Sequence, residues 1–203
     1  MEIKTIIGLS LVVFSSLMIF ICMMRKKEDF FNIRKTICDH LKIFKYCPSK
    51  YWIFYGLPLL FSVGLALIYK ASSGFYTELS VILGIILSML FAILSILTSQ
   101  DYSTVNDETQ KRKAKKVLKT TTNAIVFDSI LSLFLMLYGL VIIVLSGIKT
   151  IEIPFNTDIL KTVASCIAYY VFTIILLNLL FIVKQMSKII EFNIEVKKGN
   201  KEN

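Results

Sequence analysis

The sequence predicts an all-α membrane protein, a polytopic bundle of five transmembrane helices. Three observations favour this class. The chain of 203 residues is 56% hydrophobic, and its mean hydropathy is +0.71. Charged residues make up 18% of it, against about a quarter in soluble domains. The apolar residues gather in five long stretches, and the connectors between them are rich in lysine. We therefore expect a membrane domain over residues 1–185 and a cytosolic tail over 186–203.

Each apolar stretch is long enough to cross a bilayer as a helix. At a rise of ~1.5 Å per residue, about 19 to 23 residues span a hydrocarbon core of ~30 Å. The predicted spans cover residues 6–24, 51–69, 79–98, 123–145 and 162–183. The connector of residues 70–78 is short, so the second and third spans are predicted to be antiparallel neighbours.

The placement of basic residues predicts the orientation. All but four of the 23 lysines and arginines lie in the first connector, the third connector and the C-terminal part. The four exceptions are Lys4, Lys70, Lys149 and Lys161. Because basic residues flanking spans are retained in the cytoplasm, we expect the N-terminus outside and the C-terminus inside.

The first connector carries an amphipathic pattern. Apolar residues recur at helical spacing from Phe30 to Phe44, and Pro48 ends the pattern. Basic residues, including Arg34, Lys35 and Lys42, lie off the apolar face. This pattern predicts an interfacial helix whose basic face meets anionic lipid or a partner. Packing of the same helix against the other cytosolic connector is an equally open alternative.

The third span has a stripe of small residues. Its members are Ser80, Gly84, Ser88, Ala92 and Ser95. Small residues at this spacing let two helix backbones approach closely, within one protomer or between protomers. The same face is also suited to lining a narrow pore, and the spacing alone does not separate these hypotheses.

Polar residues inside the last two spans are further candidates for a gate. Asp128 is the single acidic residue inside a predicted span, Ser132 lies one turn further on the same face, and Asn178 lies in the fifth span. An ionisable residue at membrane depth is expensive and usually functional. Asp128 follows Thr122 by only a turn or two, so pairing with a connector lysine near the inner surface is the structural alternative.

The third connector is the main candidate for binding a polyanion or a partner. Its basic residues are Lys111, Arg112, Lys113, Lys115, Lys116 and Lys119. No proline or glycine interrupts the chain from Ser99 to Gly139, so the fourth helix is predicted to begin near residue 107 and to continue into the membrane. The tail after residue 186 fits either a helical extension or a short strand, and residues 197–203 are expected to be disordered.

Motifs that carry enzymatic chemistry are absent from the sequence. The chain has one histidine and no phosphate-binding glycine loop, catalytic triad or HExxH motif. Cys38, His40 and Cys47 match no common zinc spacing, and a fourth ligand is missing. We therefore expect no enzyme activity, no cofactor and no metal.

The chain resembles the small multi-spanning membrane subunits of bacterial anti-phage operons, such as those of the Hailong and Kiwa systems. The resemblance lies in the length, the Lys/Ile/Asn-rich composition, the basic connectors, and the stretches Tyr55–Leu60 and Leu118–Ile125. It implies an oligomeric effector or sensor in the bacterial inner (plasma) membrane with a cytosolic partner and, in the Hailong case, a channel controlled by an oligonucleotide. The five predicted spans differ from the four of the Kiwa-type subunit.

Two functions follow as hypotheses. In the first, the protein is a homo-oligomeric effector that opens an ion-conducting path when an oligonucleotide or nucleotide ligand reaches its basic cytosolic side. In the second, it conducts nothing and anchors a soluble protein partner through its basic connectors. Positive-inside topology and attraction to lipid headgroups would explain the same basic charge without a nucleotide ligand or a protein partner.

Overall fold

The computed structural model describes residue 37 and residues 52–99, 108–147 and 157–199, and its elements in these ranges are all helical. They are a π-helical turn η1 (Trp52–Gly56), α4 (Leu57–Ile68), α5 (Ser73–Thr98), α6 (Glu108–Gly147) and α7 (Thr157–Gly199). The first predicted span, and the predicted amphipathic helix apart from Ile37, lie outside the described residues.

Three of these helices are long and apolar enough to cross a membrane. They are α5, the Ala114–Gly147 part of α6 and the Asp158–Phe192 part of α7. They correspond to the third, fourth and fifth predicted spans. The second predicted span corresponds to the shorter apolar helix Trp52–Ile68, which is roughly 25 Å long at α-helical rise. The chain is therefore a helical membrane protein with at least three candidate spans among its described residues.

Two helices extend beyond their apolar parts. Helix α6 begins at Glu108 and is unbroken to Gly147, which confirms that the fourth helix starts in the polar connector. Helix α7 continues to Gly199, so the tail is a helical extension and not a strand. The prediction of disorder is wrong for residues 197–199, since polar side chains and lysines are compatible with helix where no proline intervenes.

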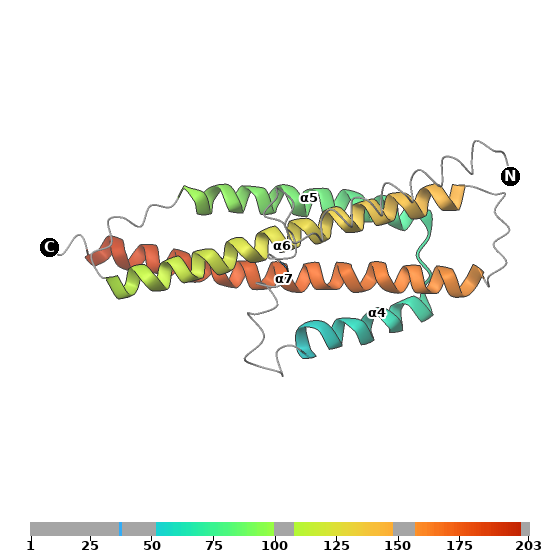
Figure 1. Cartoon of the computed structure of the whole chain (residues 1–203), viewed down its shortest axis with the longest axis horizontal. Coiled ribbons are helices and arrows are strands. Elements are labelled where there is room, and N and C mark those ends of the chain that lie inside the picture. The colour runs from blue at the N-terminus through green and yellow to red at the C-terminus, as the bar shows by residue number, and fades with distance from the viewer. Residues whose placement is uncertain (1–36, 38–51, 100–107, 148–156, 200–203) are drawn as a thin grey trace, which may run out of the picture.

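The helices lie in the spatial order α5, α6, α7, α4 (Figure 1). Helix α6 packs between α5 and α7, while α4 packs on the opposite side of α7. The prediction that the second and third spans are neighbours is therefore wrong, because α4 contacts α7 and makes no helix contact with α5. A short linker requires only that the adjoining helix ends be close, and it leaves each helix free to choose its packing partner.

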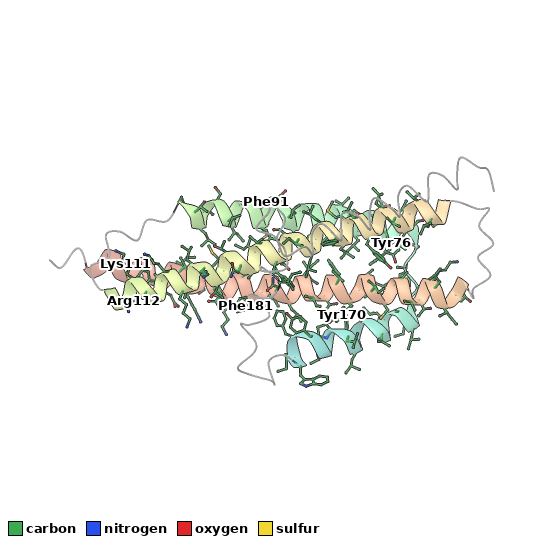
Figure 2. All side chains as sticks on the ribbon, viewed as in Figure 1. Tyr76, Phe91, Lys111, Arg112, Tyr170 and Phe181 are labelled. Atoms are coloured by element: carbon green, nitrogen blue, oxygen red, sulfur yellow. The ribbon has the colours of Figure 1, made fainter. Side chains whose placement is uncertain are left out.

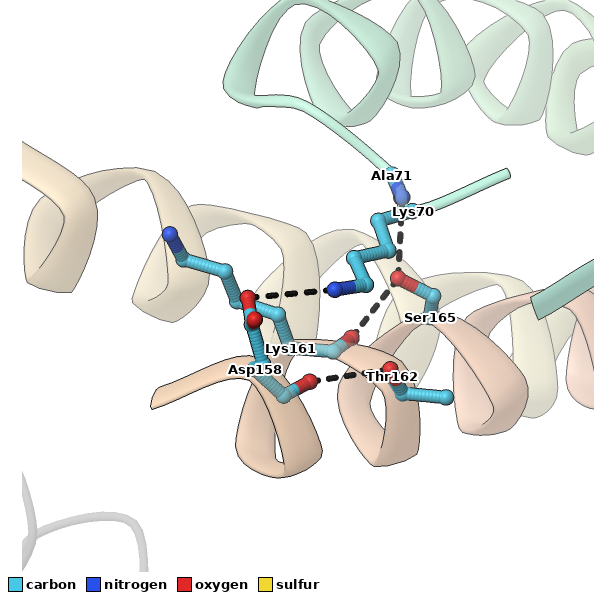
Figure 3. Close-up of polar contacts among 6 residues, drawn as sticks. All are labelled: Lys70, Ala71, Asp158, Lys161, Thr162 and Ser165. Carbon is cyan, nitrogen blue, oxygen red and sulfur yellow. Dashed lines mark hydrogen bonds and ion pairs between the residues drawn. The ribbon is translucent and has the colours of Figure 1, made fainter. Parts of the chain in front are cut away.

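The linker between α4 and α5 is attached to the start of α7 (Figure 3). The Ala71 backbone N–H donates to Ser165 Oγ at 2.9 Å, and the Ser165 hydroxyl donates to the Lys161 carbonyl at 2.8 Å. Lys70 Nζ lies 3.1 Å from Asp158 Oδ1. Both of these charged side chains are exposed, so the ion pair contributes about 1 kcal/mol or less. The hydrogen bond from Ala71 to the buried Ser165 hydroxyl holds the linker on α7 more firmly than this ion pair does.

The three long helices pack through seams with a seven-residue repeat. The buried seam of α7 contains Ala168, Ile175, Ile182 and Ile189, each seven residues after the last. In α5 the seam consists of Tyr76, Leu79, Leu83, Ile86, Leu90 and Leu97. Alternating steps of three and four residues are typical of left-handed coiled-coil packing. These seams and buried residues of α6 form one continuous apolar core.

Candidate functional site

A polar layer interrupts this core between α6 and α7. Asp128 and Ser132 lie one turn apart on the seam of α6, and Asn178 lies on α7. All three residues have 0% of their surface exposed. The bond from Asn178 to the Ala124 carbonyl places Asn178 one turn from Asp128 and two turns from Ser132, three residues that the sequence analysis selected as gate candidates. We call Asp128, Ser132 and Asn178 the polar layer.

The Asn178 side chain has a defined orientation. Its amide Nδ2 donates to the Ala124 carbonyl of α6 at 3.1 Å. A second bond, from the Tyr138 hydroxyl to the Ala164 carbonyl at 3.0 Å, joins the same two helices. The bonded residues are fourteen positions apart on both helices, so α6 and α7 run antiparallel in a regular register over two heptads. This bond uses one of the two amide N–H groups, and the Asn178 Oδ1 oxygen has no partner.

Four oxygen atoms in the polar layer have no hydrogen-bond partner. They are Asp128 Oδ1 and Oδ2, Ser132 Oγ and Asn178 Oδ1. Neighbouring hydroxyls differ, since Ser129 donates to the Ile125 carbonyl at 2.9 Å and Thr121 donates to the Val117 carbonyl at 2.8 Å. Buried polar groups are normally paired, because leaving one unpaired costs about 1 to 3 kcal/mol. The concentration of unpartnered acceptors is therefore specific to this layer.

Asp128 is fully buried in the packed bundle. It follows Lys119 by nine residues, which is about 13 Å along the helix. The register of α6 and α7 puts Lys119 beside Val183 and Lys184, so these lysines mark one limit of the apolar region. The alternative of an Asp128 side chain paired with a connector lysine is wrong for the described residues, because neither carboxyl oxygen has a partner.

The third side of the layer is apolar. A Cβ atom placed at Gly139 would lie 3.5 Å from Tyr76 Cδ1, so Gly139 of α6 lies opposite Tyr76 of α5. Counting eleven residues along each antiparallel helix puts Asp128 at the level of Ile86 and Leu87. Ile86 and its seam neighbours Leu83 and Leu90 are buried. Helix α5 therefore offers no polar partner to Asp128 at this level.

The small-residue stripe of α5 does not pack within the described protomer along most of its length. Ser88, Ala92 and Ser95 are exposed, and a Cβ atom at Gly84 would meet no atom within 4 Å. At the other end, Ser80 is half-buried beside Gly139. The larger residues of α5 form the seam to α6, which leaves the small residues and apolar neighbours such as Phe91 outside it (Figure 2).

Close packing through small residues occurs instead on α4. Its buried residues are Pro58, Ser62 and Ala66, which are spaced four apart. Ser62 Oγ lies 3.8 Å from Cys166 Sγ of α7. The sequence analysis missed this face, although the four-residue spacing of small side chains is the same signal that it used for α5.

Basic residues cluster at one end of the α6–α7 pair. On α6, Lys111 and Arg112 lie near the C-terminal end of α7 (Figure 2). Five exposed lysines follow on these helices, namely Lys115, Lys116, Lys119, Lys184 and Lys188. We call this end of the molecule the basic end. Lys113 lies in the same helix, whereas Arg34, Lys35 and Lys42 lie outside the described residues.

At the basic end the two helices stay in contact. Ala114 is buried and packs with Leu118 of α6 and Phe192 of α7. This small second core supports the basic end as a two-helix extension. The exposed lysines are thus held on packed helices, where they can present charge to a polyanion, a lipid headgroup or an acidic partner.

Within the described residues, no group of three or more histidine, cysteine, aspartate or glutamate side chains could hold a metal ion. No protein-family model, curated protein or solved structure matches this chain. The fold and the polar layer together define the class: a helical membrane protein with an ionisable residue buried in its interhelical core.

Proposed function

We propose that this chain is a membrane effector that forms a gated ion-conducting path, closed at the polar layer and opened from its basic end. The observation that carries the proposal is the set of four unpartnered oxygens in the core. A charged or polar group at membrane depth is costly and is usually retained for an ion or proton pathway. A purely structural seam would be served better by apolar side chains.

The proposal includes five spans, with the N-terminus outside and the C-terminus inside. In this orientation the basic end faces the cytosol. A cytosolic polyanion such as an oligonucleotide would be drawn to Lys115, Lys116 and Lys119 by a salt-sensitive electrostatic term. Because the basic end and the polar layer are on the same two helices, a ligand that moves α6 against α7 changes the layer directly.

Oligomerisation completes the proposal. The exposed small residues of α5 offer a face on which a second copy can pack closely. In that arrangement each protomer contributes one polar layer. A role in anti-phage defence rests only on the resemblance of this sequence to the membrane subunits of anti-phage operons, and it stays a prediction.

Flux through reconstituted vesicles tests the proposal. We expect vesicles with the inserted chain to release a cation gradient when a short oligonucleotide is present on the side of the basic end. Asp128→Leu should abolish the flux, while Ser129→Ala should retain it, because the Ser129 hydroxyl bonds only its own helix. Absence of flux with and without the oligonucleotide, for correctly inserted protein, would contradict conduction.

A non-conducting anchor is the second candidate, and the packed basic end favours it. Ala114, Leu118 and Phe192 keep the two-helix extension together, which provides a defined surface for a soluble protein. Co-purification of a partner that is lost with Lys115→Glu and Lys116→Glu, in a protein without flux, would favour the anchor over the channel.

A further inference from the structure

We propose that one row of side chains on α7 binds an anionic phospholipid, with its phosphate group held by Lys184 and Lys188 and an acyl chain lying along Leu176 and Leu180. We call these four residues the lipid stripe. The inference goes beyond the proposed function, because lipid binding at this stripe requires neither conduction nor a soluble ligand.

The first step concerns the positions of the four side chains. They are spaced four residues apart in α7, which is unbroken from Thr157 to Gly199. On an α-helix, residues four apart are surface neighbours whose Cβ atoms are about 5 to 6 Å apart, and they form inclined ridges. The lipid stripe is therefore one continuous row in which two leucines are followed by two lysines.

The second step concerns exposure. Leu176 is 40% exposed and Leu180 is 64% exposed, and both lysines of the stripe are exposed as well. The face of α7 that packs in the core is a different one, with Ile182 at its centre. Helix α4 packs on α7 nearer its start, where Ser62 lies 3.8 Å from Cys166. The described helices thus leave the stripe open to its surroundings.

The third step concerns depth in the bilayer. Between Lys161 and Lys184, α7 carries 22 residues without a single charge. At a rise of ~1.5 Å per residue they cover about 33 Å, close to the ~30 Å of a hydrocarbon core. Lys184 is therefore at the level where the hydrocarbon ends and the headgroups begin. The two leucines of the stripe lie one and two turns inside that level, where acyl chains are found.

The fourth step concerns the kind of molecule that fits this order of side chains. A soluble anion would contact the lysines and leave the leucines without a partner. A second copy packed symmetrically through the stripe would bring lysines close to lysines, and like charges repel. An anionic phospholipid complements both halves, since basic side chains next to a membrane span attract such headgroups.

Thermal unfolding of the purified full chain tests the inference. Midpoints are measured in neutral detergent with phosphatidylglycerol, with the same amount of phosphatidylcholine, or with soluble glycerol phosphate. We expect phosphatidylglycerol to raise the wild-type midpoint by about 2 to 4 °C over phosphatidylcholine, and glycerol phosphate to leave it unchanged. Lys184→Gln combined with Lys188→Gln should abolish the difference. Lys115→Gln combined with Lys116→Gln removes the same charge from exposed positions of α6 and should keep it.

Four outcomes would overturn the proposal. Equal midpoints in the two lipids would mean that the negative headgroup is not recognised. A rise with glycerol phosphate alone would assign the lysines to a soluble anion. A lipid effect lost equally in both double variants would reflect the charge of the whole basic end. A lipid effect that persists in the α7 double variant would place the lipid elsewhere.

Vesicle flux is an independent measurement. Stabilisation by phosphatidylglycerol in a protein without flux would reject conduction and keep the lipid stripe. Flux without this stabilisation would reject only the lipid stripe.

Discussion

Whether the Asp128 carboxyl group is paired depends on the residues that surround it in the fold. In sequence it is one carboxylate shortly after a polar connector, and a salt bridge to lysine is an ordinary expectation. In the structure it lies on the α6 seam, with Asn178 across the interface and apolar residues on α5. Its carboxyl group is therefore a buried and unpaired acceptor. Removal of its charge favours the stability of the fold.

Asp128→Asn should stabilise the fold. The new amide can donate to Asn178 Oδ1, which has no partner in the wild type, and the buried charge is removed. We expect the free energy of unfolding to rise by about 1 to 3 kcal/mol, measured by thermal or denaturant unfolding in detergent. A clear loss of stability would mean that the carboxylate already has a partner that keeps the fold together.

Asn178→Ala should have the opposite effect. It removes the bond to the Ala124 carbonyl and leaves a void between α6 and α7. We expect a loss of about 2 to 3 kcal/mol, combining the hydrogen bond and the void. Ser129→Ala, which removes only a bond within α6, is the control and should change stability by less than about 1 kcal/mol. Equal effects of the two changes would argue against the interhelical bond.

At the level of helices, packing partners do not follow chain order. Helices α4 and α5 are joined by a short linker, yet α4 packs on α7 and α5 on α6. The small residues Ser62 and Ala66 explain the first choice, since they let α4 approach α7 closely. The large seam residues of α5 explain the second, since they interlock with α6 at heptad spacing.

Cross-linking can check the α4–α7 contact. In a background with Cys22, Cys38 and Cys47 changed to serine, Ser62→Cys should form a disulfide with native Cys166 on mild oxidation, because the Ser62 oxygen lies 3.8 Å from that sulfur. Protection from a maleimide reagent measures the bond. Gly64→Cys is the matched control, since its side chain would point into open space. Equal protection of both variants would contradict the packing of α4.

Substitutions at two glycines distinguish a face that packs inside the protomer from a face that does not. Gly139→Leu should push against Tyr76 and destabilise the α5–α6 pair by about 1 to 3 kcal/mol. Gly84→Leu meets no described atom and should leave unfolding of the protomer unchanged. Unfolding in detergent measures both. If Gly84→Leu proves as damaging as Gly139→Leu, the seam of α5 has been assigned to the wrong face.

On the scale of the whole molecule, the charged residues divide along the long axis. Lysines and Arg112 gather at the basic end, while Lys70 and Asp158 pair at the opposite end (Figure 3). Between them lie the apolar parts of α5, α6 and α7. This distribution makes the molecule suited to sit across a bilayer with one strongly positive side.

Accessibility labelling tests the proposed sidedness. In a cysteine-free background, Ser72→Cys should react with an impermeant maleimide added to intact cells. Lys188→Cys should react only after the membrane is opened. Labelling of both positions in intact cells, or of Lys188→Cys alone, would reverse or reject the proposed orientation.

The same α5 variant provides a test at the scale of assembly. If copies pack through the small face of α5, Gly84→Leu should lower the apparent mass of the detergent-solubilised protein in size-exclusion chromatography with light scattering. Ile82→Ala, on an exposed position of α5 outside the small stripe, is the control. An unchanged mass for Gly84→Leu would place any oligomer interface elsewhere.

The sequence by itself determined the helical membrane class, the approximate positions of three apolar helices and the identity of the polar candidates. These follow from quantities that act locally, because apolar length and the cost of moving lysine out of water do not depend on which helix is the neighbour. The start of α6 in the polar connector was predictable for the same reason, since no helix breaker intervenes.

Only the tertiary structure decided which faces meet. In a membrane, lipid and helix surfaces are equally apolar, so hydrophobic pattern does not select the packing face. The small stripe of α5 and the small face of α4 look alike in sequence, yet only the latter is buried along its length in the described protomer. The proximity of Asn178 to Asp128 arises because the antiparallel register of α6 and α7 places Asn178 beside Ala124, one turn before Asp128.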